Sequence, residues 1–269
     1  MRRKVPIALS ISGSDPSGGA GLEADLKTWH QHGIYGMAIP TLLTVQNPAG
    51  VRAVRFLDPD FFREQWKFLF AAHRPDVIKI GALGSAVMVR RVGDLLRSRE
   101  ARGIPVVLDP VLGSTSGTSL LDAGALPGLK KLFRFCRLIT PNAPELALLS
   151  GREIFPKHAA ECLRDYARGQ PFAVLLKGGH LAGEESVDFL FDRGRLLRLR
   201  APRLRAVYSH GTGCVLASSI AVHLAWKRTL PQACRRAKVF VHNALAGAMT
   251  FEGGSGALDL WTESRRLKP

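Results

Sequence analysis

The sequence lacks the features that mark membrane proteins, disulfide-stapled proteins and zinc proteins. No segment approaches the roughly 18 consecutive apolar residues that a membrane-spanning helix needs, so we expect no membrane segment. Four cysteines occur in 269 residues, without a C-x-x-C pair or regular spacing, and a chain of this size does not need them as disulfides. The eight histidines form no H-E-x-x-H motif. These absences favour a cytoplasmic protein with reduced thiols.

The N-terminus resembles a secretory signal only briefly. Three basic residues, Arg2, Arg3 and Lys4, precede an apolar run over residues 5–11. The run ends at Ser12, without a long hydrophobic region or a small-residue cleavage site. A buried first strand behind a basic tail explains the segment better.

Acidic residues are few relative to basic ones. The chain has 38 Lys and Arg against 22 Asp and Glu, which gives a formal net charge of +16. Such an excess favours acidic partners such as nucleic acids, anionic membranes or phosphorylated ligands. The densest arginine stretch, residues 193–205, interleaves with leucines and has no aromatic residue on which a base could stack. We interpret it as a pair of strands with solvated arginines, and expect no specific nucleic-acid site.

Short apolar runs alternate with helical patterns along most of the chain. We find no repeat and no change of composition, so we expect one domain over residues 1–269. Strands are expected at 5–12, 37–45, 51–56, 77–80, 106–108, 138–140 and 173–176. Helices are expected at 18–32, 59–72, 85–102, 123–135 and 156–168. This alternation predicts βαβ crossovers and an α/β fold with a mostly parallel sheet.

The last third of the chain follows a different pattern. Residues 187–191 and 195–199 look like a hairpin, and helices are expected at 213–225 and 230–250. Pro40 indicates that part of the second strand is an edge or irregular. Because ligands collect at the carboxyl ends of parallel strands, the polar motifs at those ends carry the functional argument.

A glycine-rich segment, Gly13–Gly21, follows the first strand and opens a helix. Its four glycines in nine residues let the backbone approach a ligand closely. It lacks the G-K-[ST] ending of a P-loop and does not fit G-x-G-x-x-G. By itself, the segment is explained at least as well as a tight connection from strand to helix.

A second motif, His210–Cys214, precedes an apolar helix. Small residues at a helix start expose unpaired amide groups, and the helix dipole favours a negative charge there. The motif therefore suits an anion hole for a phosphoryl group during transfer. Cys214 lies in the first turn, where the pKa of a thiol can fall. The alternative, a small buried residue that packs the helix, is equally consistent with the local sequence.

Polar residues also follow three other strands. Asn142 and Glu145 are three residues apart at a helix start, so that both oxygens can face one shell of metal and water. Helix capping by Asn142 is the alternative, and both roles can hold together. Asp109 and Lys177 each end a buried strand, where phosphate, metal and substrate would meet.

Three motifs together, G-S-D-P-S-G-G-A-G, L-L-K-G-G-H and H-G-T-G-C, resemble the hydroxymethylpyrimidine/phosphomethylpyrimidine kinases of the ribokinase superfamily. Their order and approximate spacing match over roughly residues 5–250. The resemblance implies a three-layer α/β/α ribokinase-like fold, a homodimer, and ATP with Mg²⁺ as phosphoryl donor. It also implies phosphorylation of 4-amino-5-hydroxymethyl-2-methylpyrimidine, its monophosphate or both, in thiamine biosynthesis.

The resemblance also implies roles for the residues that transfer the phosphoryl group. Cys214 stands where many ribokinase relatives have a catalytic Asp, and would accept the proton of the attacking hydroxyl. Lys177 would hold the phosphates of the nucleotide. The anion hole would be formed by the amides of Gly211, Thr212 and Gly213. Magnesium and its waters would be organised by Asp109, Asn142 and Glu145.

The same resemblance implies a pyrimidine pocket and exposes three departures. The pocket would be lined by Gly13, Asp25, Gln46, Ala82 and Val111. Asp25 and Gln46 suit an aminopyrimidine edge, which offers both donors and acceptors. Ala82 stands where the family usually has Met, so one wall of the pocket is trimmed. Tyr208-Ser209 replaces the usual N-T, and the C-terminal G-x-G-P-x-x-H segment is not recognisable over residues 253–258.

Two alternatives remain open at this point. A pyridoxal or pyridoxine kinase of the same branch acts on a similar hydroxymethyl group, and Ala82 keeps that interpretation alive. A non-catalytic, nucleic-acid-binding protein on a kinase scaffold would explain the charge of +16. The complete set of Lys177, Asp109, Glu145 and Cys214 argues against lost catalysis.

Overall fold

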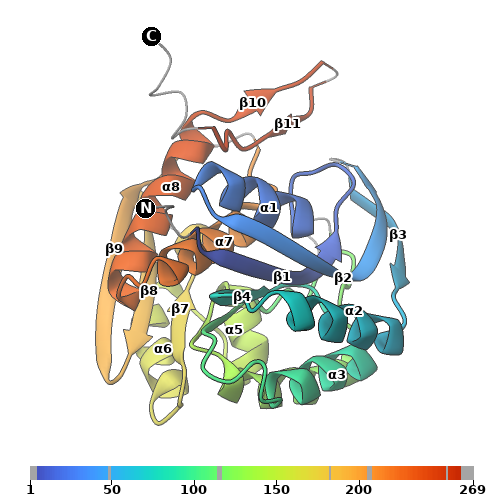
Figure 1. Ribbon diagram of the computed structural model, residues 1–269. Helices are drawn as coiled ribbons and strands as arrows, with labels where there is room; N and C mark the ends of the chain where they lie inside the picture. Colours follow the sequence, from blue (N-terminus) through green and yellow to red (C-terminus); the bar gives the residue numbers. More distant parts are fainter. Residues whose placement is uncertain are drawn as a thin grey trace.

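One large sheet organises the chain in the computed structural model (Figure 1). The structure describes residues 5–47, 50–113, 117–181, 183–204, 208–252 and 254–261. In these ranges the sheet has the order β3-β2-β1-β4-β5-β6-β7-β8-β9. Its strands are β1 (Ile7–Ser14), β2 (Tyr35–Asn47), β3 (Gly50–Phe56), β4 (Val77–Ile80), β5 (Val106–Leu108), β6 (Leu138–Ile139), β7 (Ala173–Leu176), β8 (Glu185–Asp192) and β9 (Arg195–Pro202).

The centre of the sheet is parallel and both ends are antiparallel. Strands β2, β1, β4, β5, β6 and β7 pair in parallel. Strand β3 pairs antiparallel with β2 at one end, and β8 and β9 continue antiparallel from β7 at the other. Pro40 lies in the half of β2 that precedes the first residue paired with β3, Leu42, so its missing N–H costs no bond to β3. The predicted α/β fold with a mostly parallel sheet is confirmed.

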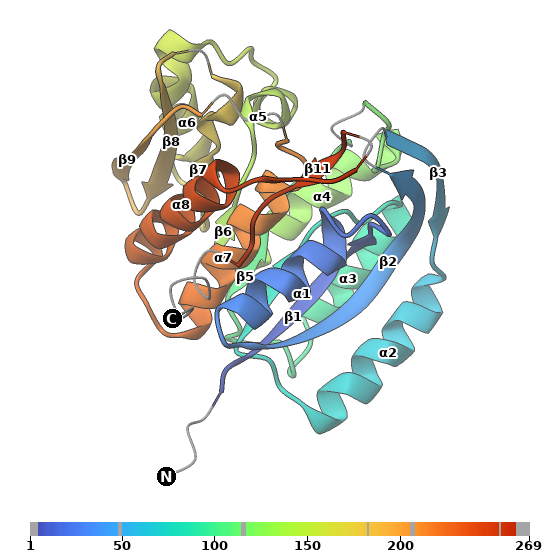
Figure 2. The ribbon, with the colours of Figure 1, turned by 90° about the horizontal axis from the view of Figure 1, so that it is seen from above.

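Helices cover both faces of this sheet, as Figures 1 and 2 show. One face carries α1 (Gly21–Gln31), α7 (Thr212–Ala225) and α8 (Leu230–Ala246). The other face carries α2 (Pro59–Ala72), α3 (Ala86–Leu96), α4 (Leu126–Leu132), α5 (Ala143–Ser150) and α6 (Ala159–Ala167). The arrangement is the three-layer α/β/α architecture that the family resemblance implied.

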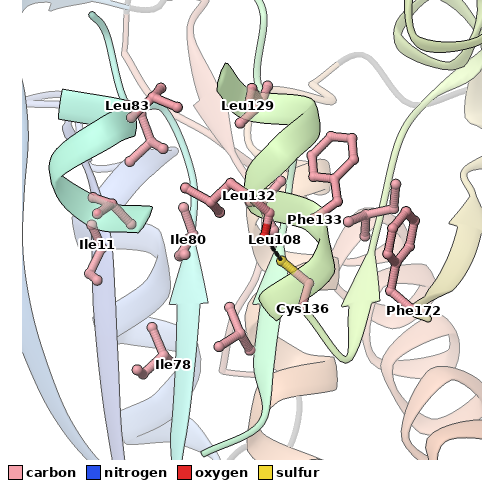
Figure 3. Packing of buried hydrophobic residues seen from close by; sticks show 14 of the residues in the cluster. Ile11, Ile78, Ile80, Leu83, Leu108, Leu129, Leu132, Phe133, Cys136 and Phe172 are labelled. Atoms are coloured by element: carbon pink, nitrogen blue, oxygen red, sulfur yellow. Dashed lines mark hydrogen bonds between the residues drawn. The ribbon is translucent and has the colours of Figure 1, made fainter. Parts of the chain in front are cut away.

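Two separate apolar cores result from the period of two along each strand. In β7, Val174 and Leu176 pack into the core under α2–α6, whereas Ala173 and Leu175 pack into the core under α1, α7 and α8. Because both faces are covered, the central strands read as continuous apolar runs. Figure 3 shows part of the first core, where the thiol of Cys136 donates to the carbonyl oxygen of Leu132 at 3.7 Å.

Two predicted helices end earlier than expected. Helix α3 ends at Leu96 because the polar residues that follow offer no further apolar face to the core. Helix α8 ends at Ala246 and its C-cap is Gly247, which lies against Asp259. The chain then forms the short pair β10 (Met249–Thr250) and β11 (Gly256–Ala257), which the sequence did not predict.

The arginine stretch is mostly as expected. Arg195, Arg198 and Arg200 are exposed on β9. Arg203 differs, because its guanidinium is half-buried and donates to the carbonyl oxygens of Gly178, Gly179, Leu181, Gly183 and Glu185. Arg205, Gly253 and the basic tail 1–4 lie outside the described residues. Within the described ranges, every helix is too short or too polar to cross a bilayer.

Candidate active site

The carboxyl ends of the parallel strands open into a cavity of about 680 Å³. Asp25 does not line it, but the other residues implied by the resemblance do. They are Gly13, Gln46, Ala82, Asp109, Val111, Asn142, Glu145, Lys177, Gly211, Thr212, Gly213 and Cys214. Positions that are as far apart as 13 and 214 in the sequence thus meet in one hollow.

The glycine-rich segment is shaped by acidic side chains. Gly21 begins α1 at φ +59°, and a Cβ there would lie 2.3 Å from the carbonyl oxygen of Gly13, so only glycine fits. Glu23 accepts hydrogen bonds from the hydroxyl of Ser14 at 2.6 Å and from the amide of Asp15 at 2.8 Å. The loop therefore has a fixed conformation at the mouth of the cavity, and the predicted helix start moves from Gly18 to Gly21.

The second glycine motif packs directly on the first. Gly211, the N-cap of α7, has φ +81°, and a Cβ there would lie 1.8 Å from the carbonyl oxygen of Gly19. A glycine N-cap has no side chain to cap the helix, which leaves amide groups of the first turn to a ligand. The amide of Thr212 is partly used, because it donates to the carbonyl oxygen of Ser209 at 3.3 Å. The N-terminus of α7 thus faces the cavity, where its amide groups could bind an anion.

Lys177 lies between two carboxylates, next to the first turn of α7, where a Cβ on Gly213 would lie 3.3 Å from its Nζ. Its Nζ is 2.6 Å from Asp109 Oδ1 and 3.5 Å from Glu145 Oε2. Burial alone would lower the pKa of Lys177, but these two carboxylates outweigh burial and raise it. Burial also raises the pKa of Glu145, against the nearby ammonium. This group can therefore present one fixed cation and two acidic side chains to a nucleotide.

Asn142 and Glu145 cap α5 and also border the cavity. Asn142 Oδ1 accepts from the amide of Glu145 at 2.8 Å, and Glu145 Oε2 accepts from the amide of Asn142 at 2.6 Å. The capping alternative therefore holds, and it leaves the side-chain nitrogen of Asn142, Nδ2, for a ligand. Among the described residues no group of three or more His, Cys, Asp or Glu could hold a metal ion. Two carboxylates nevertheless fit Mg²⁺, which keeps several waters and shares substrate phosphates.

Cys214 lies in the first turn of α7 and lines the cavity. Burial raises the pKa of its thiol, and the Asp25 and Asp109 carboxylates raise it further. The Lys79 ammonium and the backbone N–H of Gly21 act in the opposite direction. The expectation that this pKa falls is therefore wrong, because the cost of burying a thiolate exceeds the help from its surroundings.

Asp25 lies beneath the cavity in a sealed polar network. Its side chain is fully buried and receives hydrogen bonds from Lys79 Nζ at 2.8 Å, from Ser10 Oγ at 2.5 Å and from Ser218 Oγ. Lys79 is equally buried. The expected place of Asp25 on the pocket wall is thus wrong, because its oxygens are already occupied by three donors inside the protein.

Several neighbours of the site were missed from the sequence. Lys79 was missed because it lies within the buried apolar run of β4. A lysine inside such a run itself indicates a buried charged partner. Asp15 and His210 were read as parts of glycine motifs, and their hydrogen bond at 2.8 Å joins residues 195 positions apart. Arg203 was counted among solvated arginines. Only the folded chain shows these contacts.

The chain is similar to known proteins over nearly its whole length. The family model for phosphomethylpyrimidine kinase matches residues 15–259. The hydroxymethylpyrimidine/phosphomethylpyrimidine kinase of Rhizobium meliloti is 39% identical over 93% of this chain and 94% of its own length. The Salmonella typhimurium protein of that name is 40% identical with the same coverage. The chain spans 36% of the thiamine biosynthesis multifunctional protein ThiED of Corynebacterium efficiens, at 39% identity.

Solved structures show the same fold. The pyridoxal kinase of Staphylococcus aureus in complex with ADP aligns with a TM-score of 0.87 at 27% identity, over 98% of this chain and 96% of its own. The phosphomethylpyrimidine kinase of Clostridium difficile aligns with a TM-score of 0.76 at 33% identity, over 90% of this chain and 99% of its own. The predicted resemblance and the ribokinase-like fold are confirmed. This chain belongs to the phosphomethylpyrimidine kinase family.

Proposed function

We propose that this protein transfers the γ-phosphoryl group of ATP to the hydroxymethyl group of 4-amino-5-hydroxymethyl-2-methylpyrimidine, or to the monophosphate of that compound, in thiamine biosynthesis. One observation carries the proposal: Lys177 and Asp109 lie against the first turn of α7, which holds Cys214, and they line one cavity together with Glu145. Phosphoryl transfer depends on this kind of positioning and charge neutralisation. Because the chain belongs to the phosphomethylpyrimidine kinase family, we interpret this geometry as the active site of a kinase.

The donor end of the cavity is the side of Lys177. In our proposal its ammonium holds the nucleotide phosphates, while Asn142 and the first turn of α7 at Thr212 and Gly213 contribute polar groups. Asp109 and Glu145 would hold Mg²⁺ through its waters. Bound Mg²⁺ neutralises charge on the phosphates. The Staphylococcus aureus pyridoxal kinase, which shares the fold, has been solved with ADP and with AMP-PCP.

Cys214 connects the two ends of the site. We propose that it accepts the proton of the acceptor hydroxyl as that hydroxyl attacks the phosphorus atom. The amides of Gly211, Thr212 and Gly213 lie at the helix start next to it and would stabilise the charge of the phosphoryl oxygens. Since burial raises the pKa of Cys214, only a small fraction is ionised at neutral pH.

The acceptor end is lined by Gly13, Gln46, Ala82 and Val111. Gln46 can accept from the exocyclic amine of an aminopyrimidine and donate to a ring nitrogen. Pyridoxal lacks that edge, so it would leave part of the amide unpaired, at a cost of roughly 1–3 kcal/mol. Ala82 leaves room for a bulkier ring, but extra room does not replace a missing hydrogen bond. The pyrimidine is therefore the preferred acceptor.

Pyridoxal is the second candidate acceptor. Pyridoxal kinases of Staphylococcus aureus and Bacillus subtilis share the fold at TM-scores of 0.87 and 0.85. Their identity to this chain is 27%, below the 39% and 40% of the pyrimidine kinases of Rhizobium meliloti and Salmonella typhimurium. We therefore rank the pyrimidine first.

ADP release with the hydroxymethylpyrimidine, its monophosphate and pyridoxal, measured in parallel, tests the proposal. We expect kcat/KM for the pyrimidine to exceed that for pyridoxal by roughly one to two orders of magnitude. Gln46→Met should narrow the gap, whereas Ala82→Met should tighten the pyrimidine site. A preference of the unchanged protein for pyridoxal would sink the pyrimidine assignment and leave the kinase assignment intact. Turnover of none of the three would sink both.

We also propose a homodimer that buries an apolar surface at the β3 end of the sheet. Leu43, Val45, Phe56 and Phe61 are each at least 44% exposed, on β2, β3 and α2. Leu43 and Val45 project from the same face of β2, next to the edge strand β3, and exposed apolar side chains beside an open sheet edge favour a partner that covers them. Sedimentation of the unchanged protein should give the dimer mass, and Val45→Glu should give the monomer. A monomeric unchanged protein would contradict this.

The remaining parts of the proposal concern context. Residues 1–269 act as one kinase domain, in the cytoplasm, and the basic excess attracts phosphorylated ligands through its field. A specific nucleic-acid partner is not part of the proposal.

A further inference from the structure

Three polar side chains meet at the acceptor end of the cavity. Nε2 of His210 is 2.8 Å from Asp15 Oδ2 and 3.2 Å from the amide nitrogen of Gln46. Asp15 is nearly buried, with 4% of its side chain exposed, and His210 is 31% exposed. One ring nitrogen, Nε2, therefore has two polar neighbours. The carboxylate requires a donor there, whereas the amide N–H of Gln46 requires an acceptor, so Nε2 cannot satisfy both.

Asp15 decides which role the ring nitrogen takes. Burial alone would raise the pKa of Asp15, but hydrogen bonds from His210 and Ser17 lower it to about 2. The group is thus a carboxylate at neutral pH, and a carboxylate only accepts hydrogen bonds. Nε2 of His210 must carry a proton to stay 2.8 Å from it, whatever the state of Nδ1.

A protonated Nε2 cannot accept a hydrogen bond from Gln46. The amide oxygen and nitrogen of a glutamine occupy nearly equivalent positions and exchange by a half-turn of the side-chain end. With the oxygen turned toward His210, the contact becomes attractive, because the Nε2–H can be shared between Asp15 and the amide oxygen. The amide N–H groups then face the cavity.

We infer that His210, held by Asp15, is a positioning residue that fixes the Gln46 amide with its N–H groups toward the acceptor. The inference rests on the proposed function, because it assumes that Gln46 reads the acceptor ring. It specifies the acceptor further: the ring carries an unprotonated nitrogen where the amide N–H points. The second lone pair of the amide oxygen remains for the exocyclic amine beside that nitrogen.

The loops around His210 leave the ring little freedom. A Cβ on Gly19 would lie 2.7 Å from Cδ2 of His210, so the glycine lets the loop pack against the ring. Asp15 is itself held, since its Oδ1 accepts from the amide and hydroxyl of Ser17 and its Oδ2 accepts from the amide of Ala20. The hydrogen bond between His210 and Asp15 is therefore fixed by the packing of the two glycine motifs.

Two variants of His210 separate positioning from a structural role. His210→Gln keeps an N–H donor close to the place of Nε2, whereas His210→Met keeps bulk and removes the donor. The readout is the ratio of kcat/KM for the pyrimidine to kcat/KM for its analogue in which the ring nitrogen beside the amine is replaced by C–H. We expect a ratio of roughly ten or more in the unchanged protein and in His210→Gln, and a ratio near one in His210→Met.

The KM for ATP is measured in the same series and should change less than the acceptor ratio. An unchanged ratio in His210→Met overturns the inference, provided that the unchanged protein uses the pyrimidine. If the unchanged protein does not phosphorylate the pyrimidine at all, the proposed function fails instead. The two failures are thus distinguishable.

A second measurement needs only the unchanged protein. Nitrogen-15 spectra of histidine-labelled protein report the protonation of each ring nitrogen, and the signals of His210 are those missing from His210→Gln. We expect Nε2 of His210 to be protonated throughout pH 6–8. An unprotonated Nε2 at pH 7 would allow it to accept from the Gln46 amide, and would overturn the inference.

Discussion

Two lysines interact electrostatically with Cys214, and their surroundings differ. Lys79 has no exposed side-chain surface, and its partner Asp25 has none either. Lys177 keeps 14% of its side chain exposed, and it lines the cavity together with Asp109 and Glu145. The Lys79–Asp25 pair is therefore inaccessible to any ligand, whereas Lys177 and its carboxylates are accessible to a ligand in the cavity.

The difference shows what each ion pair can do. In the sealed network, Ser10 on β1, Asp25 on α1, Lys79 on β4 and Ser218 on α7 satisfy one another and fasten four elements beneath the site. A buried ion pair of this kind is costly to break, because one charge is left without a partner. In the open network, Lys177 can exchange part of its contact with carboxylates for contact with phosphates. We therefore expect Lys79 to support the fold, and we propose that Lys177 binds the nucleotide.

Cys214, which lies between the two networks, should show the largest effect on activity. Cys214→Ala removes the proposed base, and turnover should fall by roughly two to four orders of magnitude, the usual scale for general acid–base catalysis. KM values should change much less. Steady-state ADP release with the pyrimidine measures this. An Ala variant that turns over near the unchanged rate would remove Cys214 from the mechanism.

Lys79→Met should have the largest effect on stability. It leaves the Asp25 carboxylate buried without its cation, which costs about 3–5 kcal/mol of unfolding free energy. Urea unfolding at neutral pH measures the loss. The double variant Lys79→Met/Asp25→Leu removes both charges and should recover much of it. A Lys79→Met protein as stable as the parent would show that the sealed pair does not support the fold.

The pH dependence of turnover should follow the thiol. Burial and the two nearby carboxylates raise the pKa of Cys214, and the base is its deprotonated form. The turnover rate should therefore rise with pH through and above the ordinary pKa of a thiol, about 8.5. Cys214→Asp replaces the thiol by a group that ionises at lower pH, so its rate should already be level in that range. A parent rate that stays constant from pH 6 to 9 would contradict this account.

The fold was accessible from the sequence because its signals are local. Apolar runs bounded by turns located β4, β5 and β7 at their observed residues, and the helix expected at 59–72 is α2. The end of α8 was missed although Gly247 is a common helix stop, because the apolar pattern continues past it to Met249. Local patterns thus fix element types better than element ends.

The site was accessible only in part. Motifs at strand ends meet because parallel strands end at one edge, so Asp109 and Lys177 could be grouped in advance, whereas Cys214, at a helix start, joined them through the family resemblance. The sealed network depends on which way each side chain faces. Ser10 and Lys79 are register partners on β1 and β4, and only the packing of α1 and α7 brings Asp25 and Ser218 to them. That packing is not encoded in any local pattern.

The smallest expected effect is weak binding of nucleic acid by the surface arginines. Exposed residues such as Arg195, Arg198 and Arg200 should bind duplex DNA weakly at low salt, because they neutralise phosphates without reading bases. Fluorescence anisotropy of a labelled duplex should show affinity that falls steeply as salt rises. Tight, sequence-dependent binding at physiological salt would revive the nucleic-acid-binding alternative.

The most direct test of the contrast between the two lysines is the stabilisation that a nucleotide gives to Lys177→Met. Mg²⁺ with AMP-PCP binds the folded protein and should raise the unfolding midpoint of the parent; a concentration of 100 times Kd stabilises by about 2.7 kcal/mol. Without nucleotide, Lys177→Met should unfold below the parent, because it leaves the Asp109 carboxylate, whose side chain is 2% exposed, without its cation. The readout is therefore the rise that nucleotide adds to each protein's own midpoint, and this rise should be far smaller in Lys177→Met than in the parent. A variant that gains the full rise would contradict the assignment of Lys177 to the nucleotide phosphates.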